Sequence, residues 1–296
     1  MNEFKSESYA KCIIAGEHSV LRGHSALVVP VKSRALKAHW SLDDKSLELE
    51  FSGKYGRELS LIFGGALDQA CKNLGIKRNK LKGKWRLENE IQLGGGLGAS
   101  AAICVTIARY FVSIACLKES EVYKFSQELE DLFHGESSGV DIAASMNKQP
   151  IQFARNESPQ KLEVCWNPHL YLSYSGHKGL TSECVEQVKN FILEKPERAR
   201  ELDGKMQESV EMATRSLGLG ERLGFQQLKT SLDIANSCFE EWGLIDSQMR
   251  EEMNRLKSMG ASAIKPTGSG RGGYILSLWG EAQSLADKSF IPLDMV

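Results

Sequence analysis

The strongest constraint on the fold is a glycine-rich stretch at residues 91–102, which reads Ile-Gln-Leu-Gly-Gly-Gly-Leu-Gly-Ala-Ser-Ala-Ala. Glycine tolerates positive φ and lets a ligand approach the main chain closely, because it has no Cβ. A helix is predicted to begin at Gly98, and its first turn offers unpaired N–H groups and the positive end of a dipole. These features favour an anion site, most simply for the phosphates of a nucleotide. A tight structural turn before a buried helix would need the same residues, so the loop alone leaves both interpretations open.

The composition limits the class of protein. The chain has 296 residues, enough for one large domain or two of ordinary size. A net charge of −1 argues against a general nucleic-acid or membrane-surface binder. The seven cysteines include no Cys-x-x-Cys pair, which favours neither a disulfide framework nor a zinc site. Residues 1–10 do not resemble a secretory signal and no apolar run could cross a bilayer, so we expect a cytoplasmic protein.

The first half of the chain mixes short strands with longer helices. Apolar and alternating segments predict strands, and these lie at 12–15, 26–31, 35–40, 46–51 and 85–91. Asp43 and Asp44 are expected to form a turn between two of them. Helical spacing of apolar residues predicts further elements, at 59–74, 98–116, 119–133 and 141–146.

The order of predicted elements changes after Pro150, where strands are followed by a cluster of helices. Strands are predicted at 151–154, 162–165, 170–174 and 274–279. Helical segments are predicted at 182–194, 198–217, 225–242 and 246–259, with a final amphipathic segment at 282–289. A polar stretch near residues 147–160 suggests a boundary, which we place between domains 1–155 and 156–296. Strands followed by helix clusters in each half favour an α+β fold.

Four residues around the glycine loop carry the groups that phosphoryl transfer needs. Ser100 offers a hydroxyl of the kind that binds phosphate-bound Mg²⁺. Glu130 ends one predicted helix and Asp141 opens the next, so the two carboxylates can converge on one cavity. Lys11 could supply a countercharge. A phosphate cradle, metal ligands, a proton acceptor and a cation are the parts of a phosphotransferase. Each residue alone also has a plainer role, such as helix capping for Asp141.

Three separated motifs then resemble the three signatures of the GHMP kinase superfamily. They are residues 11–23, 94–102 and 265–273, in the family's order and across nearly the whole chain. Within the superfamily, Gly-Glu-His-Ser-Val at 16–20 and the segment His134–Asp141 are most similar to mevalonate kinases. Galactokinases would have Gly-Glu-His-Thr-Asp at the first of these positions. Three ordered matches are far more specific than one glycine loop.

The resemblance implies a two-domain α+β fold, with an N-terminal domain like domain 2 of ribosomal protein S5 and a ferredoxin-like C-terminal domain. It implies an ATP- and Mg²⁺-dependent kinase that phosphorylates a small-molecule alcohol, with mevalonate as the best candidate. The implied partner is therefore a small alcohol, without nucleic acid or membrane, and a homodimer is compatible with it.

The resemblance also implies roles for single residues. Asp141 would accept or orient the proton of the substrate hydroxyl, and Lys11 would stabilise the developing charge. Ser100 and Glu130 would hold Mg²⁺. The residues that would wrap the ATP phosphates are Gly94, Gly95, Gly96, Leu97, Gly98, Ala99, Ser100 and Ala101. The residues on the substrate side would be Glu17, His18, Thr181, Gly268 and Ser269.

Three positions depart from the family pattern. Gln92 replaces the usual proline, and Ala99 replaces the first of two serines. Thr181 is followed by Ser182 where the family has lysine, which concerns substrate identity more than reaction type. Two alternatives therefore stay open: a kinase for another alcohol, such as phosphomevalonate or a sugar, and a non-catalytic ligand-binding regulator on the same fold. A regulator has no need for the four phosphoryl-transfer residues together.

Overall fold

The computed structural model describes residues 2–134, 137–283 and 290–295, and its chain forms two compact units. Unit 1 consists of residues 1–10, 34–93 and 98–148. Unit 2 consists of residues 11–33, 94–97 and 149–296. Both units are discontinuous because the first two strands, β1 (Glu3–Ala15) and β2 (Ala26–Ser46), contribute residues to each of them.

The sheet of unit 1 is built from β1 and β2 together with β3 (Glu48–Ser52) and β4 (Lys82–Asn89). β3 and β4 are parallel, β2 and β4 are antiparallel with Leu36 opposite Asn89, and β1 pairs with β2. Side chains of β4 alternate between buried and more exposed, as expected for a strand with one face on the core.

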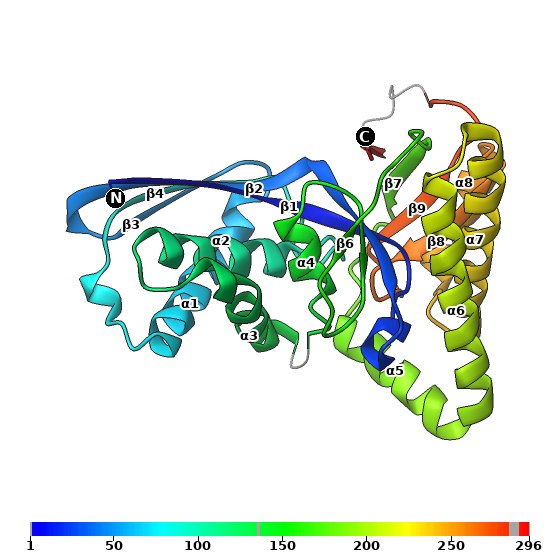
Figure 1. Ribbon diagram of the computed structural model, residues 1–296, viewed down its shortest axis with the longest axis horizontal. Coiled ribbons are helices and arrows are strands. Elements are labelled where there is room, and N and C mark those ends of the chain that lie inside the picture. The colour runs from blue at the N-terminus through cyan, green and yellow to red at the C-terminus, as the bar shows by residue number, and fades with distance from the viewer. Residues whose placement is uncertain (1, 135–136, 284–289, 296) are drawn as a thin grey trace. The chain divides into compact units, whose positions relative to one another are not determined.

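Four helices belong to unit 1: α1 (Gly56–Asn73), α2 (Ala99–Ser113), α3 (Val122–His134) and α4 (Val140–Met146). Figure 1 shows α1, α2 and α3 on one side of the strands β1 to β4. α2 is apolar around almost its whole circumference, and this composition is typical of a buried helix. Aromatic rings fill the core, with Trp85 4.7 Å from Tyr110 and 5.5 Å from Phe63 between ring centroids.

Unit 2 contains two groups of strands. Its part of β2 pairs with β5 (Ile151–Phe153), which pairs with the two-residue strand β6 (Gln160–Lys161). A second sheet is antiparallel in the order β10-β7-β9-β8, formed by Ile291–Leu293, Leu170–Tyr174, Tyr274–Leu278 and Ala263–Thr267. All five residues of β8 and all five of β9 are buried, although β8 includes Lys265 and Thr267.

Four helices accompany the second sheet: α5 (Thr181–Glu194), α6 (Pro196–Leu217), α7 (Glu221–Glu241) and α8 (Ser247–Ser258). α6 and α7 pack along each other, and both α7 and α8 contact β8 (Figure 1). The starts of two helices follow from local chemistry. Pro196 takes the first position of α6, and the carboxylate of Asp246 caps α8 by accepting from the N–H of Met249 at 2.9 Å.

The α+β class is confirmed, and most predicted helices are present with small changes at their ends. Two local predictions are wrong. Asp43 and Asp44 do not form a turn between two strands, since β2 continues to Ser46 with a register shift after Ser41. Residues 162–165 form no strand, because the N–H groups of Leu162 and Cys165 donate to the carbonyls of Pro150 and Leu217 instead.

Three predictions or elements need a separate comment. β10 was not predicted from the sequence, and residues 284–289 of the final amphipathic segment lie outside the described residues. The division into domains 1–155 and 156–296 stays a prediction, while the compact units follow the discontinuous division given above. Within the described part of the chain, no helix combines the length and apolarity needed to cross a membrane.

Candidate active site

The glycine loop folds as its sequence requires. Gly94, Gly96 and Gly98 have φ of +71°, +81° and +74°, a region that residues with a Cβ rarely adopt. Gly98 is the N-terminal cap of α2, so the N–H groups of the first helical turn follow the loop directly. At its other side the carbonyl of Leu97 accepts a 3.0 Å hydrogen bond from the N–H of Lys11 in β1. The loop therefore has the backbone conformation and the helix start that anion binding needs.

Unit 1 brings Ser100 and Glu130 together, although they come from different helices. The Ser100 hydroxyl in the first turn of α2 donates to Oε1 of Glu130 in α3 at 3.4 Å. A third residue joins them, since the Ser137 hydroxyl donates to Oε2 of Glu130 at 2.5 Å. Glu130 is only 2% exposed, so these hydroxyls compensate part of the cost of burying its carboxylate.

Asp141 follows closely on this cluster along the chain. The Ser137 hydroxyl also accepts from the N–H of Gly139, which has a φ of +80° and caps α4. Asp141 lies in the first turn of α4 and is half-buried. A Cβ on Gly139 would come within 2.1 Å of the Tyr123 hydroxyl, so this turn requires glycine. Gly135 and Glu136, which belong to the same sequence motif, lie outside the described residues.

The oxygen atoms of Glu130 and its partners have the chemistry of a magnesium site. They are carboxylate and hydroxyl oxygens, which Mg²⁺ prefers, and Mg²⁺ commonly takes one or two protein ligands beside phosphate oxygens and water. Within the described residues there is no group of three or more His, Cys, Asp or Glu side chains that could hold a metal alone. The residues thus fit a metal that arrives with a nucleotide, and their role as ligands stays a prediction.

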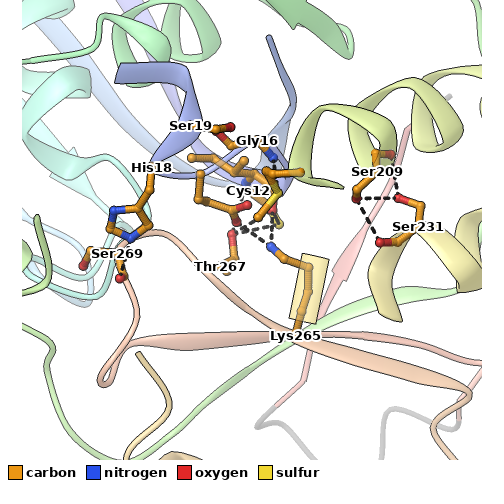
Figure 2. A network of polar contacts seen from close by, with 12 residues as sticks. Cys12, Gly16, His18, Ser19, Ser209, Ser231, Lys265, Thr267 and Ser269 are labelled. Atoms are coloured by element: carbon orange, nitrogen blue, oxygen red, sulfur yellow. Dashed lines mark hydrogen bonds and ion pairs between the residues drawn. The ribbon is translucent and has the colours of Figure 1, made fainter. Parts of the chain in front are cut away.

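Unit 2 holds Glu17 in a buried ion pair. Its Oε1 pairs with Nζ of Lys265 in β8, and both side chains are at most 2% exposed (Figure 2). Lys265 also donates to the carbonyl of Ile13 at 3.3 Å and lies 5.2 Å from the centroid of the Phe239 ring. Burial raises the pKa of Glu17, and the charge of Lys265 opposes this shift. The contact of Glu17 with substrate stays a prediction.

His18 is also buried and occupies a strained backbone position, with a φ of +60°. Its Nε2 lies 2.9 Å from the carbonyl of Ser269 (Figure 2). Its ring centroid lies 5.5 Å from that of Trp242. Burial lowers the pKa of His18 to about 4, so the imidazole is neutral near pH 7. Thr181 reaches the same loop, with its hydroxyl 3.4 Å from that of Ser269.

The loop between β8 and β9 contains Gly268 and Ser269 and packs against the glycine loop. A Cβ on Gly268 would lie 3.4 Å from the carbonyl oxygen of Gly96, and one on Gly273 would lie 2.7 Å from that of Gly95. This loop is also tied to β1, because the Thr267 hydroxyl bonds both the N–H and the carbonyl of Ile13 at 3.1 Å. Unit 2 therefore brings the first and third motifs and residues 94–97 of the second into one region.

Sequence reasoning missed two residues of these clusters. Lys265 was placed in the third motif but given no role, although a lysine within an apolar strand needs a buried partner. Ser137 carried no signal of its own, since serine is common in polar loops. Both became visible only through their contacts with Glu17 and Glu130.

Comparison with known families supports the chain's resemblance to kinases. Residues 60–149 match the family described as "GHMP kinases N terminal domain". The mevalonate kinase of Thermococcus sibiricus is 27% identical over 302 residues, covering 93% of this chain and 89% of the relative. The mevalonate kinase of Aeropyrum pernix is 25% identical, covering 94% and 89%.

Two solved structures share the fold of this chain. The mevalonate kinase of L. major in complex with R-mevalonate has a TM-score of 0.78 at 20% identity, covering 94% of this chain and 87% of that one. The phosphomevalonate kinase of Streptococcus pneumoniae has a TM-score of 0.73 at 16% identity, covering 98% of each chain. The matched domain and the mevalonate kinase relatives together support an ATP-dependent kinase that acts on an alcohol.

Proposed function

We propose that the protein is a mevalonate kinase, which transfers the γ-phosphoryl group of ATP to the primary hydroxyl of mevalonate and yields 5-phosphomevalonate and ADP. The observation that carries this proposal is the similarity to mevalonate kinases along nearly the whole chain, with 27% identity over 93% of its residues in one case. The Gly-Glu-His-Ser-Val segment at 16–20 supports the same choice over a galactokinase.

In this proposal Asp141 accepts the proton of the substrate hydroxyl as its oxygen bonds to the γ-phosphorus and the bond to ADP breaks. A half-buried carboxylate in the first turn of a helix suits this role, because it is held in place by the backbone. Lys11 stabilises the negative charge that develops on the reacting oxygens. It is 3% exposed and belongs to β1, so its backbone is fixed.

The nucleotide is proposed to bind with its phosphates at Gly94–Ala101, where positive-φ glycines and the start of α2 present backbone N–H groups. Ser100 and Glu130 would hold Mg²⁺, which when bound neutralises phosphate charge during transfer. His18, Thr181 and the Gly268–Ser269 segment are proposed to face the alcohol, as is Glu17.

A substrate panel tests the proposal. Purified protein with ATP and Mg²⁺ is given R-mevalonate, phosphomevalonate, galactose or homoserine, and ADP release is followed in a coupled assay. We expect kcat/KM to be highest for R-mevalonate. A higher kcat/KM for phosphomevalonate or a sugar would favour the kinase for another alcohol. Ligand binding without turnover of any alcohol would favour the non-catalytic regulator.

Replacing the proposed base gives the second test. Asp141→Asn should lower kcat by about 10²- to 10⁴-fold, because a positioned general base contributes that much. The matched control is Asp44→Asn, since the Asp44 side chain is fully exposed on β2. If Asp141→Asn retained the rate of this control, Asp141 would not be the base. A thermal melt of both variants shows that each remains folded.

Cellular location and assembly stay predictions: a cytoplasmic protein that allows a homodimer. Light scattering of the purified chain measures its mass in solution and so tests the homodimer directly.

A further inference from the structure

We propose that Lys178 is a phosphate-binding residue that places a positive charge beside Gly94 of the glycine loop. This inference rests on the proposed function, because it assigns a further contact to the same nucleotide. Lys178 is not one of the residues that the family motifs singled out. It lies on the segment between β7 and α5, 84 residues along the chain from Gly94, and the fold brings the two together within unit 2.

The side chain of Lys178 runs along the face of the glycine loop. A Cβ built on Gly94 would lie 3.2 Å from Cδ, 3.8 Å from Cε and 3.9 Å from Cγ of Lys178. The aliphatic part of the lysine therefore occupies the space in which any other residue at 94 would place its side chain. The ammonium is one bond beyond Cε, which brings its charge to the edge of the loop.

The backbone that carries Lys178 is fixed on both sides. The N–H of Ser175 donates to the carbonyl of Gly273 at 2.9 Å, and the N–H of Gly273 donates to the carbonyl of His177 at 2.8 Å. Next along the chain, Gly179 approaches the third-motif loop so closely that a Cβ there would lie 2.5 Å from the carbonyl oxygen of Gly270. Residues 175–179 are thus held against the same loop that packs on the glycine loop.

A side-chain contact adds a third anchor. Nε2 of His177 lies 2.8 Å from Oδ2 of Asp246, whose other oxygen caps α8. The residue directly before Lys178 is therefore tied to the start of a helix. A lysine with an anchored backbone and a flexible stem can place its ammonium on a phosphate with little loss of conformational entropy in the backbone.

The charges of the region agree with this role. A triphosphate carries several negative charges, and backbone N–H groups supply only partial positive charge to balance them. The backbone of Lys11 bonds to that of Leu97, and the side chain of Lys178 lies against Gly94, so a lysine residue neighbours each end of residues 94–97. Arg271 on the neighbouring loop donates to Oε1 of Gln187 at 2.8 Å.

The test compares the binding of ATP with that of adenosine, which carries no phosphate. Lys178→Met keeps a similar stem against Gly94 and removes the charge, and Lys178→Arg keeps the charge. We expect Lys178→Met to weaken ATP binding by about 10- to 100-fold in calorimetry, the value of a hydrogen bond to a charged group. Adenosine affinity, measured by competition, should be unchanged, and Lys178→Arg should bind ATP nearly as the unaltered chain does. The control is Lys229→Met, which removes a charge from an exposed pair with Asp233 on α7.

The outcomes separate this inference from the proposed function. If Lys178→Met binds ATP as tightly as Lys229→Met while the unaltered chain phosphorylates mevalonate, the inference is wrong and the proposed function stands. Equal losses of ATP and adenosine affinity would also overturn it, because they would show a general disturbance of the site. If the unaltered chain neither binds ATP nor turns over any alcohol, the proposed function fails first. A selective loss of ATP affinity, restored by Lys178→Arg, supports the inference.

Discussion

Two buried glutamates, one in each compact unit, show how the partner of a carboxylate decides what it can do. Glu130 and Glu17 are each 2% exposed. Glu130 accepts hydrogen bonds from the hydroxyls of Ser100 and Ser137, whereas Glu17 pairs with the ammonium of Lys265. Carboxylate and hydroxyl oxygens together form a donor set that a cation can join. A carboxylate–ammonium pair already contains its cation, so it is suited to hold segments of the fold together.

The buried Glu17 carboxylate depends strongly on its ion pair with Lys265. Within the described residues, Oε2 of Glu17 is buried without a hydrogen-bond partner. Burial alone raises the pKa of Glu17, and Lys265 acts against that rise. Removing the ammonium would therefore leave a carboxylate without solvent and without its ion-pair partner, which is among the costly changes in a protein interior.

The largest expected effect tests this dependence. Lys265→Met should lower the free energy of unfolding by about 3–5 kcal/mol, as breaking a buried ion pair does. The double variant Glu17→Gln, Lys265→Met should recover part of the loss, because it leaves no buried charge. Urea denaturation measures both. Lys229→Ala serves as control, since the exposed Lys229–Asp233 pair contributes only about 0.3–0.5 kcal/mol. A loss no larger than the control's would break the contrast between the two glutamates.

The next effect concerns the free energy of unfolding in acid, to which His18 contributes. The pKa of His18 is about 4 when folded and 6.5 ordinarily, so the unfolded chain binds more protons between these values. The contribution of His18 to the free energy of unfolding should therefore fall by about 3 kcal/mol as pH drops from 6.5 to 4. Glu17 works in the opposite direction, because its raised pKa favours the folded state in acid.

Urea denaturation at several pH values measures this dependence. His18→Asn removes the imidazole while keeping a residue that tolerates positive φ, and it should flatten the curve over this range. A slope that is identical in His18→Asn and the unaltered chain would assign the acid response to other groups.

The smallest of the three effects concerns Glu130. Glu130→Gln should weaken the apparent affinity for Mg²⁺ in ATP turnover by about 10- to 100-fold, or about 1.5–3 kcal/mol. It should cost less stability than Lys265→Met, because an amide needs no countercharge. Glu128→Gln is the matched control on the exposed side of α3. Magnesium titrations of both variants decide it, and equal Mg²⁺ dependence would remove Glu130 from the metal site.

Local patterns predicted where some strands lie, but not whether a segment finds a partner strand. β7 was predicted over 170–174, where it lies, because an apolar segment is bounded by polar turns. The segment 162–165 has the alternation of a strand, yet its backbone bonds to Pro150 and Leu217. Alternation shows that a segment has two faces, but a strand also needs a neighbouring strand with free edge groups, and sequence does not show that neighbour.

The site divides in the same way. Ser100 and Asp141 could be singled out because each lies in a recognisable motif, and Glu130 because it ends a predicted helix. The structure joins Ser100 and Glu130 by a hydrogen bond. Lys265, the partner of Glu17, is 248 residues away in sequence. Lys178, which lies against Gly94, belongs to the segment between β7 and α5, outside the motifs. Such pairs depend on how distant strands and loops meet, which no single segment encodes.

The passage of β1 and β2 through both compact units has a consequence for how the chain is made. Residues 11–33 belong with residues 149–296, and residues 34–148 contain most of unit 1. On the ribosome, the segment around Ile13 must therefore wait for Thr267, its hydrogen-bond partner, until almost the entire chain has been synthesised. A gene cut after codon 148 would separate residues 149–296 from residues 11–33 and 94–97 of the same unit, and so from the parts of β1 and β2 that belong to unit 2. The second piece alone is therefore not a transferable module, and exchange of unit 2 should succeed only with residues 11–33 and 94–97 included.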